Sequence, residues 1–218
     1  MTEFVRLALL GGVLGLDATA VGQFMVSRPL VAGWIAGGMA GEPAMGITVG
    51  AILELFLLVS VPSGGARYPE GSTAAVVGVG VASSLDGPGA VALGVTLGLV
   101  WGQVGGWSVT MQRRVNGRLL RWRAFAGPES LGWSHALGIT TDFLRGSAVT
   151  FSGMVLGRGA LVLVDEHWPV SSAASTGVLY AGAAVSLGIL LNDLGGLRRR
   201  RLMFVLCLTL GAAGASLL

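Results

Sequence analysis

The sequence predicts an all-α protein that crosses a membrane several times. Of its 218 residues, 53% are hydrophobic and 11% are charged, whereas about 25% of the residues in soluble domains are charged. The mean hydropathy is +0.76, which leaves too few polar side chains to cover a surface that faces water. A soluble globular enzyme and a disordered protein are therefore excluded. At about 20 residues for each span, the length allows roughly six to eight transmembrane or re-entrant helical segments, including broken helices.

Glycine content is the second observation behind this fold class. The chain has 37 glycines, and their share is more than twice the usual value of about 7%. Small residues let membrane helices approach closely where lipid provides no hydrophobic drive. Two sets of glycines recur at four-residue spacing, each on one helix face: Gly94, Gly98, Gly102 and Gly106, and Gly33, Gly37 and Gly41. We expect both faces to pack against other helices, in preference to holding a ligand.

The apolar segments follow one another along the chain with polar or Gly/Pro-rich breaks between them. The expected segments are 5–26, 30–39, 46–61, 72–85, 90–107, 146–164, 176–191 and 202–218, and the main breaks are 62–71, 86–89 and 165–169. The first segment has Glu3 beside Arg6 and no convincing cleavage site, so we expect a retained helix in preference to a signal peptide. Several early segments are too short for a full crossing, which is typical of broken or re-entrant elements at a transport site.

Two arginine blocks set the expected orientation. Five arginines lie within 113–123 without an acidic residue, four more lie at 198–201, and lysine is absent. Both blocks adjoin long apolar runs, so the positive-inside rule places them on the cytoplasmic side, whereas a nucleic-acid interface needs such patches on a soluble face. We expect one membrane domain, 1–218, with a first half at 1–112 and a second half at 132–218. Between them, 113–131 would form a cytoplasmic arginine-rich loop with an amphipathic helix on the membrane surface.

Ionisable side chains inside the apolar runs are the candidate functional residues. A charge near the bilayer centre costs at least about 2.5 kcal/mol, so it is kept only where it faces protein or water. Glu54 is the clearest case, because no neighbouring cation in its run balances it. Its carboxylate can accept hydrogen bonds from the hydroxyls of a polyol. The alternative is a structural salt bridge with Arg28 or Arg145 from another segment.

The other candidates have competing structural interpretations. Asp17 fits a ligand role and a helix-end cap with Thr19 equally well. His135 fits a proton relay, but a satisfied polar residue at the membrane interface is favoured. Further ionisable or amide residues lie inside these runs or near their ends: Gln23, Arg28, Glu70, Asp142, Arg145 and Arg158. No metal-ligand spacing, phosphate-binding loop or catalytic triad motif occurs in the sequence, so we expect a conduit or carrier without a metal or cofactor.

An ordered string of residues in the first 85 positions shows a family resemblance. It runs from residues 23–33 through Gly41, Gly46-Ile47, Gly50 and Leu53-Glu54-Leu55 to Val61-Pro62, 64–66 and Pro69-Glu70. A weaker similarity follows at Trp133-Ser134-His135, with Arg145 ten residues after the histidine. These motifs resemble the IIC membrane subunit of the mannose/fructose/sorbose-type phosphotransferase system (PTS). Family members commonly have Asp where this chain has Glu70, and 118–132 is not recognisably similar.

The resemblance implies a sugar-translocating subunit of the bacterial inner membrane. Such a chain pairs with a IID membrane subunit, works with cytoplasmic IIA and IIB proteins, assembles as an oligomer and has no phosphoryl-carrying residue of its own. A hexose would bind near the midplane and pass inward by alternating access. The resemblance implies Gln23, Glu54 and the Pro69-Glu70 loop as sugar-binding candidates, with Arg28 and His135 as weaker ones beside Asp17. A non-transporting scaffold or regulatory remnant, and a membrane subunit of another small-solute importer, stay open as alternatives.

Overall fold

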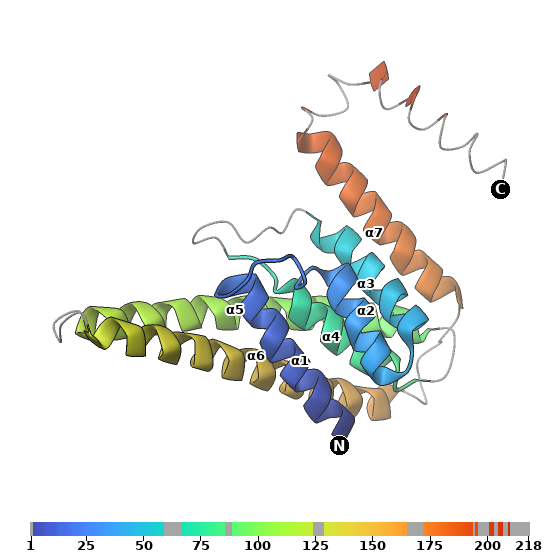
Figure 1. Ribbon diagram of the computed structural model, residues 1–218. Helices are drawn as coiled ribbons and strands as arrows, with labels where there is room; N and C mark the ends of the chain where they lie inside the picture. Colours follow the sequence, from blue (N-terminus) through green and yellow to red (C-terminus); the bar gives the residue numbers. More distant parts are fainter. Residues whose placement is uncertain are drawn as a thin grey trace.

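The computed structural model describes residues 2–58, 67–85, 89–123, 129–164 and 172–193, with 195, 201–202, 205–206 and 209. Within this part of the chain the regular secondary structure is entirely helical, which confirms the predicted fold class (Figure 1). The helices are α1 (Thr2–Thr19), α2 (Pro29–Ala40), α3 (Pro43–Leu57), α4 (Gly71–Ala82), α5 (Ala90–Arg123), α6 (Glu129–Val164) and α7 (Ser172–Asp193).

The boundaries of the helices differ from expectation at several points. The first helix stops at Thr19 instead of residue 26, because Asp17 binds backbone N–H groups of the following loop and turns the chain back. Some expected elements lie wholly or mostly outside the described residues: the stretch 62–66, the turn at 86–88, the loop at 165–169, the arginines at 198–200, and the segment 202–218 with Cys207.

Helices α2, α3 and α4 are too short to cross a membrane. At 1.5 Å per residue, the 12 residues of α2 and of α4 span about 18 Å and the 15 residues of α3 about 22 Å, against about 30 Å of hydrocarbon. Proline at the first position starts both α2 and α3. Gly41 ends α2 with a positive φ of 84°, a left-handed conformation that glycine adopts without steric cost. The expectation of short, broken elements in the first half is confirmed.

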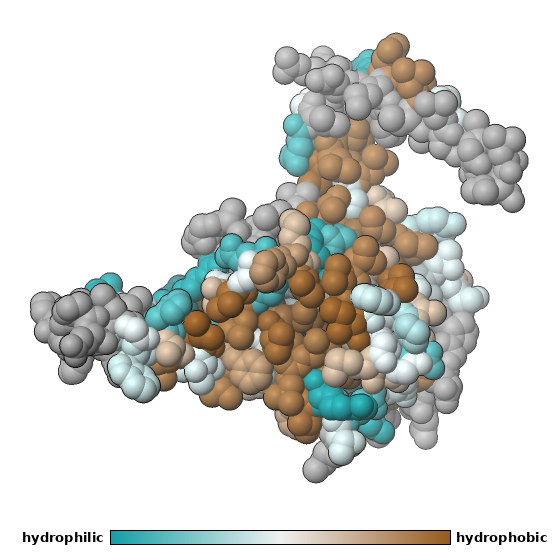
Figure 2. Space-filling view, viewed as in Figure 1, coloured by the Kyte–Doolittle hydropathy of each residue, from teal (hydrophilic) through white to brown (hydrophobic). Residues whose placement is uncertain are grey.

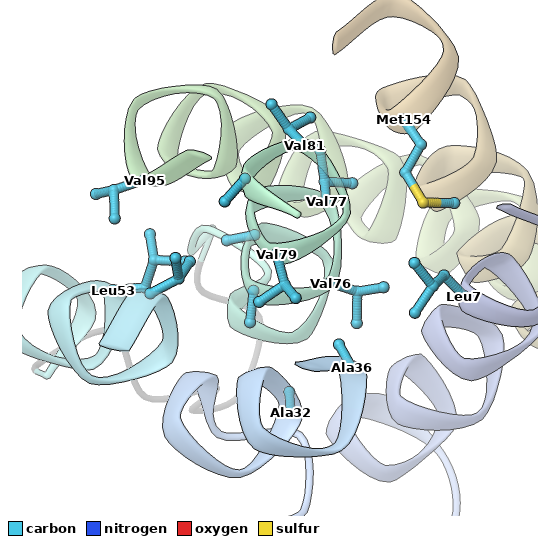
Figure 3. Close-up of a cluster of buried hydrophobic side chains, with 14 of the residues drawn as sticks. Leu7, Ala32, Ala36, Leu53, Val76, Val77, Val79, Val81, Val95 and Met154 are labelled. Atoms are coloured by element: carbon cyan, nitrogen blue, oxygen red, sulfur yellow. The ribbon is translucent and has the colours of Figure 1, made fainter. Parts of the chain in front are cut away.

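Helix α4 lies at the centre of the packing. Every residue from Ser72 to Ala82 is buried, and α4 contacts α1, α2, α3, α5 and α6. Figure 3 shows valines of α4 packed among Leu7 of α1, Leu53 of α3 and Met154 of α6. A helix that is apolar on all sides is buried in this way. Because α4 is held on all sides, the position of its N-terminus, and of residues 68–70 just before it, is well defined.

Glycines bring neighbouring helix backbones into direct contact. A Cβ added at Gly33 of α2 would lie 2.6 Å from the Gly46 carbonyl oxygen of α3, and one at Gly37 would lie 2.7 Å from the Gly46 Cα. A Cβ at Gly94 of α5 would lie 2.5 Å from the Gly78 carbonyl oxygen of α4. The segment 68–74 closely approaches the other glycines of the α5 face: Gly98, Gly102 and Gly106. The predicted close packing of these faces is confirmed, except that Gly41 serves as the cap of α2.

Helices α5 and α6 form a long hairpin that projects beyond the other helices (Figure 1). Their 34 and 36 residues span about 51 Å and 54 Å. Both differ from expectation, because α5 continues to Arg123 instead of bending onto the membrane surface, and α6 begins at Glu129 instead of residue 146. No proline interrupts 90–123, and Gln112 of α5 donates a hydrogen bond to Thr141 of α6 at 2.7 Å.

The surface is apolar over much of the body. Figure 2 shows hydrophobic residues across the visible face of the central helices and along α7, and Trp34, Leu144 and Leu156 are each more than half exposed. Within the described residues, two helical stretches are long and apolar enough to cross a membrane, Ala90–Arg118 and Ser172–Asp193. Exposed apolar areas of this extent are typical of contact with lipid or with another subunit.

Candidate functional site

The ends of several broken helices meet around a small cavity, which we call the helix-end cavity. Its volume is about 40 Å³. The cavity lies between the end of α1, the N-terminus of α2, the end of α3 and the N-terminus of α4. Its lining residues are Ala18, Ser27, Arg28, Pro29, Leu57, Tyr68, Pro69, Glu70 and Gly71. Two of the predicted sugar-binding residues, Arg28 and Glu70, therefore face the same space.

Glu54 of α3 forms an ion pair with Arg28. The Arg28 Nε donates to Glu54 Oε1 at 2.7 Å, and a terminal guanidinium nitrogen also binds this oxygen. The other carboxylate oxygen accepts the backbone N–H of Leu30, in the first turn of α2, at 3.3 Å. The structure thus shows the Arg28 salt bridge that was the alternative interpretation of Glu54. The side chains remain 23% and 19% exposed, so the pair is not sealed from its surroundings.

Glu70 anchors a second, deeper ion pair with Arg145 of α6. The two terminal guanidinium nitrogens lie 2.8 Å and 3.1 Å from the two Glu70 oxygens. Arg145 also donates to Asp142 at 2.8 Å and to Ser108 of α5 at 2.9 Å, and the Thr73 hydroxyl donates to Glu70 at 2.5 Å. The Glu70 side chain has no exposed surface. Buried charges persist only when they are paired and hydrogen-bonded, and this cluster meets that condition.

The other predicted site residues lie outside the helix-end cavity. Asp17 accepts the backbone N–H of Phe24 at 2.7 Å and of Ser27 at 2.9 Å, so it holds the loop between α1 and α2. Gln23 is exposed on this loop, and His135 lines a different space. The structure therefore brings Arg28 and Glu70 to one cavity, attaches Glu54 to it through Arg28 and Asp17 through Ser27, and leaves Gln23 and His135 apart.

A larger cavity, which we call the hairpin cavity, lies between the end of α1 and the α5–α6 hairpin. Its volume is about 360 Å³, and its lining residues are Thr19, Ala20, Val109, Gln112, Arg113, Asn116, Ser134, His135, Gly138, Ile139 and Asp142. Sequence reasoning missed Gln112 and Asn116. Their four-residue spacing places them on one helix face, but the expected boundary between the first half and the arginine-rich loop, at residue 112, separates the two. Among the described residues, no group of three or more His, Cys, Asp or Glu side chains can hold a metal ion.

Comparisons with known proteins identify relatives of this fold. The family described as the PTS system sorbose-specific IIC component matches residues 1–191. A solved chain described only as a membrane protein has a TM-score of 0.74 at 17% identity, and the alignment covers 100% of this chain and 93% of that one. The mannose transporter ManYZ, solved in complex with microcin E492 (MceA), has a TM-score of 0.62 at 17% identity with the same coverage. No curated protein sequence matches significantly.

Proposed function

Because the chain belongs to the family of sorbose-specific IIC components of the phosphotransferase system, and is thus a sugar-transport subunit, we propose that it binds a hexose at the helix-end cavity. The observation behind this proposal is the convergence of Arg28, paired with Glu54, and of Glu70 at the ends of broken helices. In transporters, substrates bind where such half-helices end within the membrane. All of these residues lie within the matched range.

The chemistry of the lining suits a sugar. The guanidinium of Arg28 donates to the hydroxyl groups of a sugar, and hydrogen bonds to ionised groups are roughly twice as strong as neutral ones. The hydroxyls of Ser27 and Tyr68, which also line the cavity, can donate or accept. The arrangement therefore offers both donors and acceptors to a polyol without an unpaired buried charge.

The cavity must enlarge to hold a hexose. Its volume of about 40 Å³ is close to the roughly 30 Å³ that one water molecule occupies in the liquid. Two ion pairs indicate which parts move together, since Arg28–Glu54 ties α2 to α3 and Glu70–Arg145 ties the start of α4 to α6. The cavity lies on the seam between these two groups. We infer that they separate along this seam during alternating access, with the sugar between them.

Other components complete the transport system in this proposal. The chain would act in the bacterial cytoplasmic membrane with a IID membrane subunit and would pass its sugar to cytoplasmic IIA and IIB proteins for phosphorylation. Support comes from the family match and from the fold shared with the mannose transporter ManYZ. Wild-type uptake is expected only in cells that also express IIA, IIB and IID, and full uptake without IID would contradict the pairing.

Replacement of Glu54 tests the site. Glu54→Gln keeps the shape of the side chain but removes the charge that holds Arg28, so we expect uptake of labelled mannose or sorbose to fall by about tenfold or more, which corresponds to about 1.4 kcal/mol. Sugar affinity of the purified complex should fall in parallel. Glu42→Gln, at an exposed position before α3, is the matched control and should retain uptake. Wild-type uptake and affinity in Glu54→Gln would remove Glu54 from the site.

A further inference from the structure

The hairpin cavity has the size and lining of a binding site for an uncharged polyol. Its volume of about 360 Å³ lies within the range of roughly 300–1,000 Å³ that is usual for small-molecule sites. Gln112 and Asn116 bring amide groups, and the carboxylate of Asp142 and the guanidinium of Arg113 place one charge of each sign on the lining. Val109 and Ile139 offer apolar surface to the C–H faces of a sugar ring. This combination recognises hydroxyl groups without demanding a charge on the ligand.

Side chains in contact with one another separate the two cavities. Tyr68 lines the helix-end cavity and Arg113 lines the hairpin cavity. Arg113 donates a hydrogen bond to the Tyr68 hydroxyl at 3.2 Å, and its guanidinium carbon lies 5.6 Å from the centre of the tyrosine ring. Elsewhere, the wall consists of Glu70, Arg145 and Asp142 in succession.

The two walls differ in how firmly they are held. Arg145 is 8% exposed and binds Glu70 and Asp142 through three hydrogen bonds, so opening that side would strand buried charges at a large cost. Tyr68 is buried but neutral, and Arg113 is exposed, so parting them leaves no buried charge without a partner, and their contact contributes about 0.5–2 kcal/mol. The Tyr68 side is therefore the one that opens more readily.

We propose that the hairpin cavity is a second sugar-binding station and that the contact between Tyr68 and Arg113 is the gate that separates it from the helix-end cavity. This inference rests on the proposed function of the helix-end cavity as the first station. When Tyr68 turns away from Arg113, the two spaces join, and a hexose passes from Arg28 and Glu70 toward Gln112, Asn116 and Asp142. The path then leads toward the arginine-rich end of α5.

Filling the hairpin cavity tests the second station. A Cβ added at Gly138 would meet only the Asn116 Nδ2, at 3.8 Å, so Gly138→Leu occupies the cavity without a backbone clash. Gly132→Leu is the matched control, since Gly132 lies in the same helix with nothing within 4 Å of an added Cβ. The probes are labelled mannose and sorbose, titrated into the complex purified from native membranes.

The expected result is sugar binding in two separable steps by the wild type and by Gly132→Leu, with the second step lost in Gly138→Leu. Retention of both steps in Gly138→Leu, or a single step in the wild type that Glu54→Gln removes, would overturn the second station while leaving the first intact. Loss of a step in Gly138→Leu with no effect of Glu54→Gln would instead overturn the proposed helix-end site.

The gate is tested by Tyr68→Phe, which keeps the ring and removes the hydroxyl. Exchange of unphosphorylated sugar across proteoliposomes should become faster by about two- to tenfold, the range that corresponds to one lost hydrogen bond. A purely structural role of Tyr68 would make exchange slower. Tyr180→Phe, at a position of α7 that is 69% exposed, should leave exchange unchanged. Unchanged or slower exchange in Tyr68→Phe would overturn the gate.

Discussion

At the scale of single residues, the charges inside the apolar helices are held in specific pairs. Sequence alone predicted which ionisable residues are unusual, because a charge in an apolar run is rare whatever its partner. It offered the Arg28–Glu54 pair only as an alternative and did not predict the Glu70–Arg145 pair. Arg28 and Glu54 are 26 positions apart, and Arg145 and Glu70 are 75 apart. Their pairing depends on how the helices pack, which no local pattern encodes, and the only partner that sequence reasoning weighed for Arg145 was Glu54.

Removal of Arg145 should strongly destabilise the protein. Arg145→Met leaves Glu70 buried without its counter-charge, so we expect a loss of about 3–5 kcal/mol in the free energy of unfolding. Arg114→Met, at an exposed position of α5, is the control and should change the stability by less than about 0.5 kcal/mol. Denaturant titration in detergent, followed by circular dichroism, measures both. Equal stability of the two variants would contradict a structural role for the pair.

At the scale of helices, glycine spacing predicted contacts better than hydropathy predicted helix ends. The four-residue glycine repeats mark faces that do pack closely, because a residue without a side chain permits close backbone approach in any fold. Hydropathy instead indicates which part of the chain suits a lipid environment, and this part need not end where the helix ends. Residues 113–123 leave the apolar run but stay helical, since arginine and leucine favour helix in water as well as in a membrane. The end of the apolar run was therefore mistaken for the end of the membrane-crossing helix, with a separate amphipathic helix expected after it.

The glycine contact between α2 and α3 should not tolerate a methyl group. A Cβ at Gly46 would lie 2.7 Å from the Gly37 Cα, so Gly46→Ala forces the two backbones apart. Overpacking of this kind costs about 1–3 kcal/mol. Gly38→Ala, where an added Cβ meets nothing within 4 Å, should match or exceed wild-type stability because alanine favours helix. Thermal unfolding of both variants tests this, and a Gly46→Ala protein as stable as Gly38→Ala would refute the close contact.

At the scale of the whole molecule, the long α5–α6 hairpin fixes which segments share a side of the membrane. The two helices run in opposite directions, so the arginine-rich end of α5 lies at the other end of the hairpin from residue 164 (Figure 1). The all-helical class and the broken first half followed from composition and segment length. The grouping of helices around α4 did not, because its apolar sequence looks the same whether it faces lipid or protein.

Labelling of single cysteines tests the orientation. In a background with Cys207→Ser, Arg118→Cys should react with a membrane-impermeant maleimide in inverted vesicles and not in whole cells, because the positive-inside rule places 113–123 in the cytoplasm. Ser172→Cys, at the start of α7 on the opposite side, should show the reverse pattern. Reaction of Arg118→Cys in whole cells would contradict the cytoplasmic assignment.

The conformation of the loop between α1 and α2 affects the position of Arg28, although most of the loop lies outside the helix-end cavity. Gln23 and Met25 hold φ values of 54° and 64°, a backbone shape that costs a non-glycine residue roughly 1–2 kcal/mol. The carboxylate of Asp17 offsets this cost by tethering the loop just before Arg28. Loss of the Asp17 carboxylate would let the loop relax and would move Arg28 away from Glu54. Asp17 need not contact the transported molecule, yet it determines whether Arg28 is in place to bind it.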